Sequence, residues 1–274
     1  MAFVPAHTFV GDPAAPQLAL LLHGALGSGS NLRSLASKLA KLRPKYRFCL
    51  VDLRHHGESQ GAPPPNTLES CAQDLAALIA QVGQEPDVIA GHSFGGKTAL
   101  MFSALFPGRT RQLWILDSNP GSQQPTPTNE VMRVIQAVRN TSTPAADRAQ
   151  VVQELTLQGL SIGTANWLAT SLRRRPEGFV WCFNLDSIYE LMLDYFRVDL
   201  WPVLESGTTD SDFRVVVGER SDRWAPENRT RLQTMLQIVR ERGTVEVDIV
   251  PAAGHWLHVD NASFLIELMS QNLY

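Results

Sequence analysis

The sequence predicts an α/β protein in which helices cover both faces of a mostly parallel β-sheet. Short, continuous apolar runs at 18–22, 88–90 and 113–116 alternate with longer segments of helical periodicity. Unbroken apolar runs are typical of parallel strands that are buried on both faces. Because the loops between these elements are short, the alternation favours a parallel sheet over separate layers of helices and strands.

The elements of the first half follow one another regularly. Strands are expected over 3–10, 18–22, 48–51, 87–90 and 113–116. The intervening helices each carry an apolar face: one capped by Asn31 with Leu32, Leu35, Leu39 and Leu42, one from 67 to about 82 with Leu68, Cys71, Leu75, Leu78 and Ile79, and one over 98–105.

The pattern changes between about residues 121 and 207. Strand-like runs vanish there, and amphipathic helical segments replace them. Arg173, Arg174 and Arg175 are interpreted as the solvated end of one such helix. Strands at 213–217 and 245–250 and helices at 226–242 and 264–273 then resume the alternation. We therefore expect a core formed by 1–120 and 208–274, with 121–207 inserted as a helical cap.

Composition excludes several classes of protein. The 274 residues are 44% hydrophobic and 19% charged with a net charge of −3, which gives no basic footprint for nucleic acid or an anionic membrane. No apolar stretch is long enough for a membrane span, and no signal peptide is evident. Three widely spaced cysteines favour reduced thiols. We expect a cytoplasmic protein that is a monomer or a weak homo-oligomer.

The pentapeptide 91–95, Gly-His-Ser-Phe-Gly, has the G-x-S-x-G pattern of a nucleophile elbow. It lies between a predicted strand and a predicted helix, as that motif requires. Such a tight turn holds the serine in a strained conformation and presents its hydroxyl at the carboxyl edge of the sheet. Ser93 is the expected nucleophile.

A serine nucleophile needs a base, and that base needs an acid that fixes its tautomer. His255 follows the last predicted strand directly, at the same edge of the sheet as Ser93. Asp222, between a strand and His255, gives the chain order Ser, Asp, His and is the preferred acid. Asp117, which ends the strand after the elbow helix, is the alternative.

Acyl transfer also places negative charge on the former carbonyl oxygen, which two backbone N–H groups usually stabilise. We expect one donor to be the N–H of Phe94, directly after the nucleophile. The other is expected from Ala25, in the glycine-rich loop after the strand at 18–22.

Four motifs together resemble the α/β-hydrolase fold over essentially the whole chain: His23-Gly24, the segment 52–59, the segment 91–96, and Gly254-His255. Within that superfamily, the segments 91–97, 183–186 and 254–258 are similar to those of small esterases of the abhydrolase-domain-containing 11 group and their bacterial counterparts. The resemblance implies a carboxylesterase or thioesterase that forms an acyl-serine intermediate and uses no cofactor.

The resemblance leaves the acid open. The group commonly has serine three residues after the glycine that ends the penultimate strand, and Ser221 occupies that position, which favours Asp117. The spacing from Asp222 to Pro226, however, matches the wider superfamily. Asp186 is a third choice, inside the expected cap.

The expected reaction is hydrolysis of carboxylic esters or thioesters with short to medium acyl chains. A serine-triad carbon–carbon hydrolase or lyase, or a slow receptor-like binding protein, is the alternative. The sequence has no HExxH motif and no P-loop or dinucleotide fingerprint, so neither a metal nor a cofactor is expected. Cap aromatics are candidate pocket residues: Trp167, Phe179, Trp181, Phe183, Tyr189, Tyr195 and Phe196.

Overall fold

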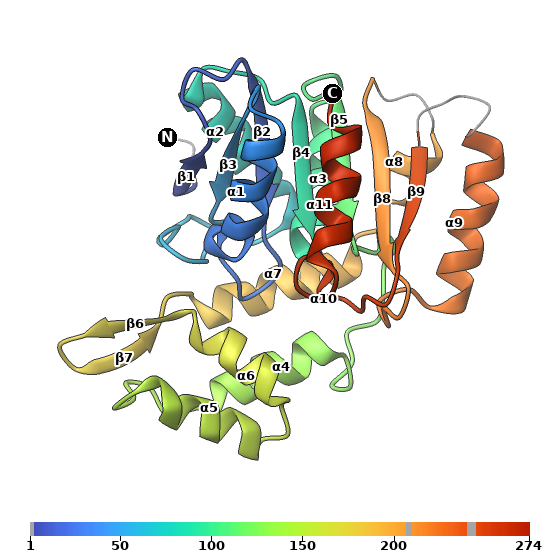
Figure 1. The fold of residues 1–274 in the computed structure, drawn as a ribbon. Coiled ribbons are helices and arrows are strands. Elements are labelled where there is room, and N and C mark those ends of the chain that lie inside the picture. Colours follow the sequence, from blue (N-terminus) through green and yellow to red (C-terminus); the bar gives the residue numbers. More distant parts are fainter. Residues whose placement is uncertain (1–2, 207–209, 240–244) are drawn as a thin grey trace.

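The computed structural model describes residues 3–206, 210–239 and 245–274 (Figure 1). Within this part of the chain, seven strands form one sheet in the order β1-β3-β2-β4-β5-β8-β9. All neighbouring pairs are parallel except β1 with β3. The strands are β1 (His7–Val10), β2 (Gln17–Leu22), β3 (Tyr46–Val51), β4 (Val88–His92), β5 (Gln112–Leu116), β8 (Asp212–Gly218) and β9 (Val245–Val250).

Helices cover both faces of this sheet, as the apolar runs predicted. In β2, Leu18, Leu20 and Leu22 pack into one apolar cluster, whereas Ala19 and Leu21 pack into the other, because successive side chains of a strand point to opposite faces. The first cluster includes side chains of α2 (Leu68–Val82), α3 (Phe94–Leu105) and α9 (Pro226–Val239), and the second those of η1 (Gly29–Leu32), α1 (Arg33–Leu42), α10 (Leu257–Asp260) and α11 (Ala262–Asn272). The last residues of the helix expected over 226–242 lie outside the described residues.

The register of the parallel strands brings several loops to one edge of the sheet. Leu22 pairs with Gly91, His92 with Leu116, and Leu116 with Val216. The loops after β2, β4, β5, β8 and β9 therefore start side by side. These loops, together with Phe94 at the start of α3, contain every residue that the sequence nominated for catalysis, apart from Asp186.

The segment between β5 and β8 lies beneath that carboxyl edge (Figure 1). Its residues 121–206, called the inserted segment below, are predominantly helical. The expected boundary between 207 and 208 lies outside the described residues. The inserted segment contains α4 (Glu130–Arg139), α5 (Arg148–Leu157), α6 (Ile162–Ala169), β6 (Leu172–Arg175), β7 (Gly178–Trp181), α7 (Leu185–Arg197) and α8 (Trp201–Glu205).

The hairpin of β6 and β7 corrects the expectation of a wholly helical insertion. Arg173 and Arg174 pair with Val180 and Phe179 across the hairpin, so the arginine run is a strand and not a helix end. The helical spacing of apolar residues extends as far as Leu172. In the structure, however, α6 ends at Ala169, and the chain changes to extended backbone after a turn at 170–171. A short strand paired locally gives no apolar run of its own, so the sequence contained little signal for it.

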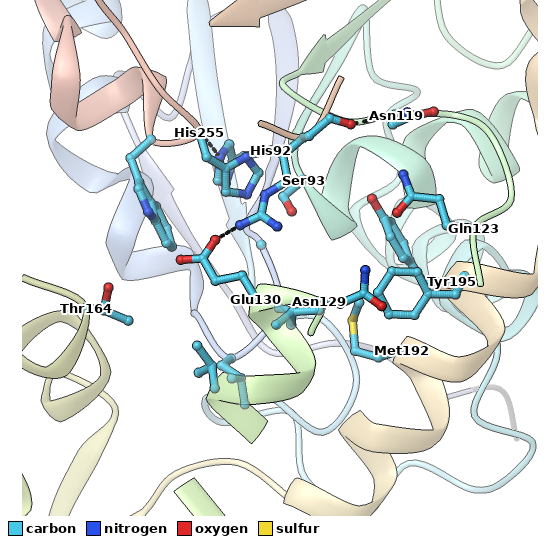
Figure 2. Close-up of a pocket in the computed structure, with 18 of the residues that line it drawn as sticks. His92, Ser93, Asn119, Gln123, Asn129, Glu130, Thr164, Met192, Tyr195 and His255 are labelled. Atoms are coloured by element: carbon cyan, nitrogen blue, oxygen red, sulfur yellow. Dashed lines mark hydrogen bonds and ion pairs between the residues drawn. The ribbon is translucent and has the colours of Figure 1, made fainter. Parts of the chain in front are cut away.

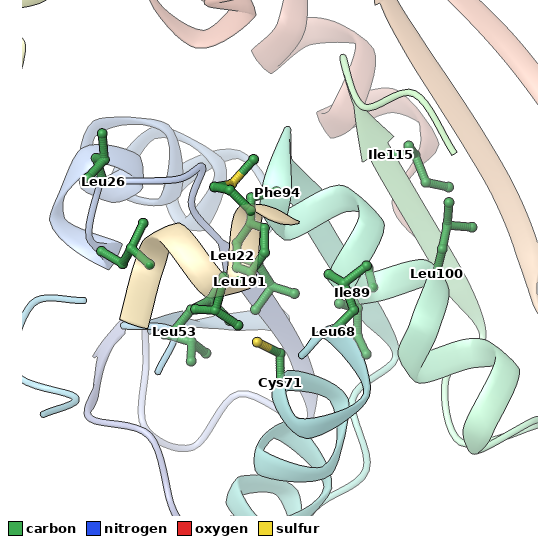
Figure 3. Packing of buried hydrophobic residues seen from close by; sticks show 14 of the residues in the cluster. Leu22, Leu26, Leu53, Leu68, Cys71, Ile89, Phe94, Leu100, Ile115 and Leu191 are labelled. Atoms are coloured by element: carbon green, nitrogen blue, oxygen red, sulfur yellow. The ribbon is translucent and has the colours of Figure 1, made fainter. Parts of the chain in front are cut away.

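Helix α7 joins the inserted segment to the core. Its Leu191 lies among Leu22, Leu53 and Phe94 in one continuous apolar cluster (Figure 3). Polar contacts add to this packing: the backbone N–H of Leu68, at the start of α2, donates to the carboxylate of Asp194 at 2.8 Å. The two parts of the chain thus share one hydrophobic core.

Candidate active site

Ser93 lies at a turn whose backbone is strained. Its φ of 53° and ψ of −116° are rarely adopted by residues other than glycine. The turn is so tight that a Cβ on Gly91 would lie 2.1 Å from the carbonyl oxygen of Gly95. Two hydrogen bonds to neighbouring residues hold the turn in place. Ser93 N–H donates to the Leu116 carbonyl, and Ser118 Oγ donates to the Ser93 carbonyl. The sequence between β4 and α3 therefore forms the predicted elbow.

The imidazole of His255 meets a buried carboxylate at this edge. His255 Nδ1 lies 2.7 Å from Asp117 Oδ2, and the Asp117 side chain is fully buried. Two further donors hold that carboxylate: Gly218 N–H at 3.0 Å and Ser221 Oγ at 2.5 Å. Asp117 is thus fixed in place by the loop after β8 while it contacts the histidine from the loop after β9.

Burial governs the protonation of this pair. It raises the pKa of Asp117, although the hydrogen bonds from Ser221 and Gly218 act in the opposite direction. Burial also lowers the pKa of His255, and the nearby guanidinium of Arg223 lowers it further. The imidazole is therefore neutral near pH 7, with Nδ1–H donating to Asp117 and Nε2 free to accept a proton.

The other two candidate acids lie away from this histidine. The side chain of Asp222 is 73% exposed, and its ion-pair partner is Arg223 at 3.5 Å. Asp186 is 87% exposed and pairs with Arg139. Chain order favoured Asp222 as the acid, but the carboxylate that contacts His255 belongs to Asp117. Ser221, one residue earlier, occupies the inward position of that loop.

His92 holds the main chain of His255, a role that the sequence did not indicate. Its Nε2–H donates to the carbonyl oxygen of His255 at 2.8 Å. Burial lowers the pKa of His92 well below its usual range, so the ring is neutral and can keep its other nitrogen unprotonated. No local pattern distinguishes this histidine from any other residue at the second position of a G-x-S-x-G motif.

The loop after β2 lies against Ser93. A Cβ on Gly24 would lie 3.4 Å from the Cβ of Ser93. Leu26, two residues further along this loop, is held by His56, because its N–H donates to His56 Nε2 at 3.0 Å. Within the described residues, neither the N–H of Ala25 nor that of Phe94, the first residue of α3, donates to a protein acceptor.

Two buried histidines place this loop. His23 Nε2 accepts from Leu53 N–H, and its Nδ1–H donates to Gly24. His56 Nδ1–H donates to Arg54 in the same way. Burial lowers the pKa of His23 to about 4 and that of His56 to about 3, so both act as neutral donors and acceptors. Their positions in loops gave no sign of this scaffolding role.

A cavity opens between these loops and the inserted segment (Figure 2). Ser93 and His255 line it from the core, and Glu130, Met192 and Tyr195 line it from the inserted segment. Of the aromatic side chains nominated from the sequence, Trp167, Tyr195 and Phe196 line this cavity. The others make different contacts: Trp181 stacks on Phe183, while Tyr189 and Phe179 lie under Arg139 and Arg148.

The described residues contain no group of three or more His, Cys, Asp or Glu side chains arranged to hold a metal ion. In the same residues, none of the helices has the length and apolar character needed to cross a membrane. Cys49, Cys71 and Cys182 are free thiols.

Comparison with known proteins places this fold and site in a family. The model of the alpha/beta hydrolase family matches residues 19–268. The chain belongs to this family. Its membership confirms both the predicted fold class and the resemblance given by the sequence motifs.

Among curated alpha/beta hydrolases, the chain is 28% identical over 268 residues to sn-1-specific diacylglycerol lipase ABHD11 of Mus musculus, covering 96% of this chain and 82% of the relative. It is 24% identical over 256 residues to Esterase YbfF of Escherichia coli, covering 93% and 92%. A solved structure described as a marine microorganism esterase superposes with a TM-score of 0.81 at 24% identity, covering 98% of this chain and 99% of the other.

Proposed function

We propose that this alpha/beta hydrolase is a serine esterase that cleaves carboxylic esters or thioesters of short to medium acyl chains. The observation that carries the proposal is the contact of the buried Asp117 with His255, an imidazole that lines the same cavity as Ser93. The names of the relatives, which are esterases and lipases, support the same class of activity.

The proposed reaction begins when Ser93 Oγ attacks the substrate carbonyl while His255 Nε2 takes its proton. Asp117 keeps the imidazole in the required tautomer and stabilises the imidazolium that forms. The N–H groups of Phe94 and Ala25 receive the oxyanion. His255 then gives its proton to the leaving alkoxide or thiolate, which leaves an acyl-serine.

Deacylation repeats these steps with water. His255 takes a proton from the water as it attacks the acyl carbonyl, and returns that proton to Ser93 Oγ when the acid leaves. Every proton transfer passes through His255, and water is the only co-reactant, so the proposed reaction needs no cofactor.

The inserted segment is proposed to act as a cap that selects the acyl group. Support comes from its side chains in the cavity, where Trp167, Met192 and Tyr195 provide apolar surface beside the carboxylate of Glu130. Trp167 in turn packs against Trp256 of the core, with ring centroids 4.6 Å apart. Apolar surface of this kind favours contact with the carbon chain of an acyl group.

The test is hydrolysis of p-nitrophenyl esters from acetate to decanoate, with Ser93→Ala as the blank. The proposal predicts turnover that is highest at one chain length and absent in the variant. Turnover no faster than the blank across the series would contradict a simple esterase. Binding of the same esters without turnover would instead favour a receptor-like protein.

A further inference from the structure

Arg223 is a cation in the catalytic cavity to which the proposed reaction assigns no role. It follows β8 and lines the cavity together with Ser93 and His255. Its backbone N–H donates to Ser221 Oγ at 3.2 Å, and its carbonyl accepts from Asn119 at 3.3 Å. Because Ser221 also donates to Asp117, the backbone of Arg223 is held by the residues that fix the triad.

The guanidinium of Arg223 has an unused donor. Nη2 forms an ion pair with Glu130, but the buried Nε–H has no hydrogen-bond partner in the described part of the chain. Asp222 Oδ1 lies 3.5 Å from Nε without meeting the geometry of a hydrogen bond. A buried donor left unpaired costs free energy, so this atom favours a ligand that supplies an acceptor.

The geometry of the free donor indicates which ligand would fit. Nε and Nη2 of an arginine form one edge of a fork that a carboxylate can bridge with two parallel hydrogen bonds. Glu130 bonds to Nη2 and leaves Nε unpaired. A carboxylate that reached both nitrogens would bind better than Glu130 does.

Glu130 is suited to being displaced. It lies in the first turn of α4, on the opposite wall of the cavity (Figure 2). Its side chain is 44% exposed. Released from Arg223, its carboxylate would be solvated without further rearrangement. An ion pair of such exposure contributes little net free energy, so exchange for a bidentate partner is favourable.

The other polar side chains of the cavity cannot replace this interaction. Among its described lining residues, Arg223 carries the only guanidinium or ammonium group and Glu130 the only carboxylate. Asn119, Gln123 and Asn129 are uncharged. His92 is neutral and already donates to the His255 carbonyl.

We propose that Arg223 determines specificity for esters that carry a carboxylate a few bonds from the scissile carbonyl, such as monoesters of dicarboxylic acids. The substrate carboxylate takes the place of Glu130 and bonds to both Nε and Nη2. This inference rests on the proposed esterase function and narrows it to an anionic class of substrate.

The test compares matched esters. The monoethyl esters of succinate, glutarate and adipate are set against ethyl 4-methylpentanoate, 5-methylhexanoate and 6-methylheptanoate, in which an isopropyl group replaces the carboxylate. The readout is the ratio of kcat/KM for each anionic ester to that for its neutral partner. Because any effect of Arg223 on the basicity of His255 acts on both esters, it cancels in this ratio.

Arg223→Met should lower the ratio about 10- to 100-fold, mainly through KM, since two charge-assisted hydrogen bonds are lost. Glu130→Gln should raise it, because the competitor for the guanidinium is weakened. Arg220→Met is the matched control: Arg220 lies on the same loop, is exposed and does not line the cavity, so its ratio should equal the wild type's. An unchanged ratio in Arg223→Met would overturn the proposal.

A binding measurement separates this proposal from the esterase function itself. Monoethyl glutarate is titrated calorimetrically into Ser93→Ala and into Ser93→Ala with Arg223→Met. Binding to Ser93→Ala that is lost when Arg223→Met is added supports the role of Arg223, whether or not the wild type turns over any ester. Absence of turnover with such binding would count against the esterase function only. Equal binding, or binding to neither protein, would contradict the role of Arg223.

Discussion

The two walls of the catalytic cavity are built in different ways. On the core wall, directed hydrogen bonds hold the carboxylate of Asp117, to which Ser221 and Gly218 donate, and the carbonyl of Ser93, to which Ser118 donates. The opposite wall, from the inserted segment, supplies Met192 and Tyr195 mainly through apolar packing. Directed bonds fix atoms for chemistry, whereas packing shapes a volume. This difference agrees with the proposals that the core performs the reaction and that the inserted segment, together with Arg223 of the core, selects the substrate.

The inserted segment is itself divided. Helix α7 is bound to the core, and the buried Lys97 of α3 donates to the Tyr195 carbonyl at 2.6 Å and to Gly121 at 2.8 Å. By contrast, Leu157 of α5 is 80% exposed and Ile162 of α6 is 60% exposed. Substitutions on α7 should therefore affect both stability and catalysis, and those on the outer face of α5 and α6 neither.

The largest effect should come from the acid of the core wall. Asp117→Asn is expected to lower kcat about 10⁴-fold, because the amide no longer stabilises the imidazolium or enforces its tautomer. Steady-state kinetics on the best p-nitrophenyl ester provide the measurement. Asp222→Asn is the matched control and should stay within about threefold of the wild type, as expected for an exposed side chain. A large loss in Asp222→Asn with a small one in Asp117→Asn would reverse the assignment.

A smaller effect on kcat is expected from His56, which holds the loop after β2 and does not itself take part in the proposed reaction. His56→Ala removes the acceptor of Leu26 N–H and loosens the loop that presents Ala25 to the oxyanion. We expect kcat to fall about 10- to 100-fold, less than the loss of an oxyanion donor itself, with KM changing little. His7→Ala, near the amino-terminal end of β1, serves as the control. A change confined to KM would show that the loop binds substrate and does not stabilise the transition state.

The contribution of Lys97, which joins α3 to the inserted segment, can be tested through the pH dependence of stability. Burial lowers its pKa to about 7, although Asp199 and Asp194 oppose the shift, whereas the unfolded chain has a lysine pKa of about 10.4. Between these values the unfolded state binds more protons, so this residue makes the free energy of unfolding rise with pH from about 7 to 10.4. Below pH 7 both states are protonated and the contribution is constant.

Lys97→Met should therefore flatten that rise. Urea unfolding of the wild type and the variant at pH 7 and pH 9.5 measures the difference, with Lys38→Met as the control for loss of an exposed lysine. Parallel pH dependence in the wild type and Lys97→Met would show that the buried ammonium keeps its usual proton affinity.

The sequence predicted the core wall better than the opposite wall. Ser93 and His255 each follow a strand directly, so local motifs were sufficient to expect both at the carboxyl edge of the sheet. The choice between Asp117 and Asp222 depended on which side chain of the loop after β8 turns inward, and adjacent residues such as Ser221 and Asp222 differ by that orientation alone. The contacts of Arg223 with Glu130 depend on how the inserted segment packs, which no local pattern encodes.

The most direct test of the central assignment is covalent labelling by a fluorophosphonate, followed by peptide mass spectrometry. The account predicts one adduct per chain, located on Ser93, with labelling that is absent in Ser93→Ala and far slower in Asp117→Asn than in Asp222→Asn. Labelling of a different residue, or equal rates in the two aspartate variants, would contradict it.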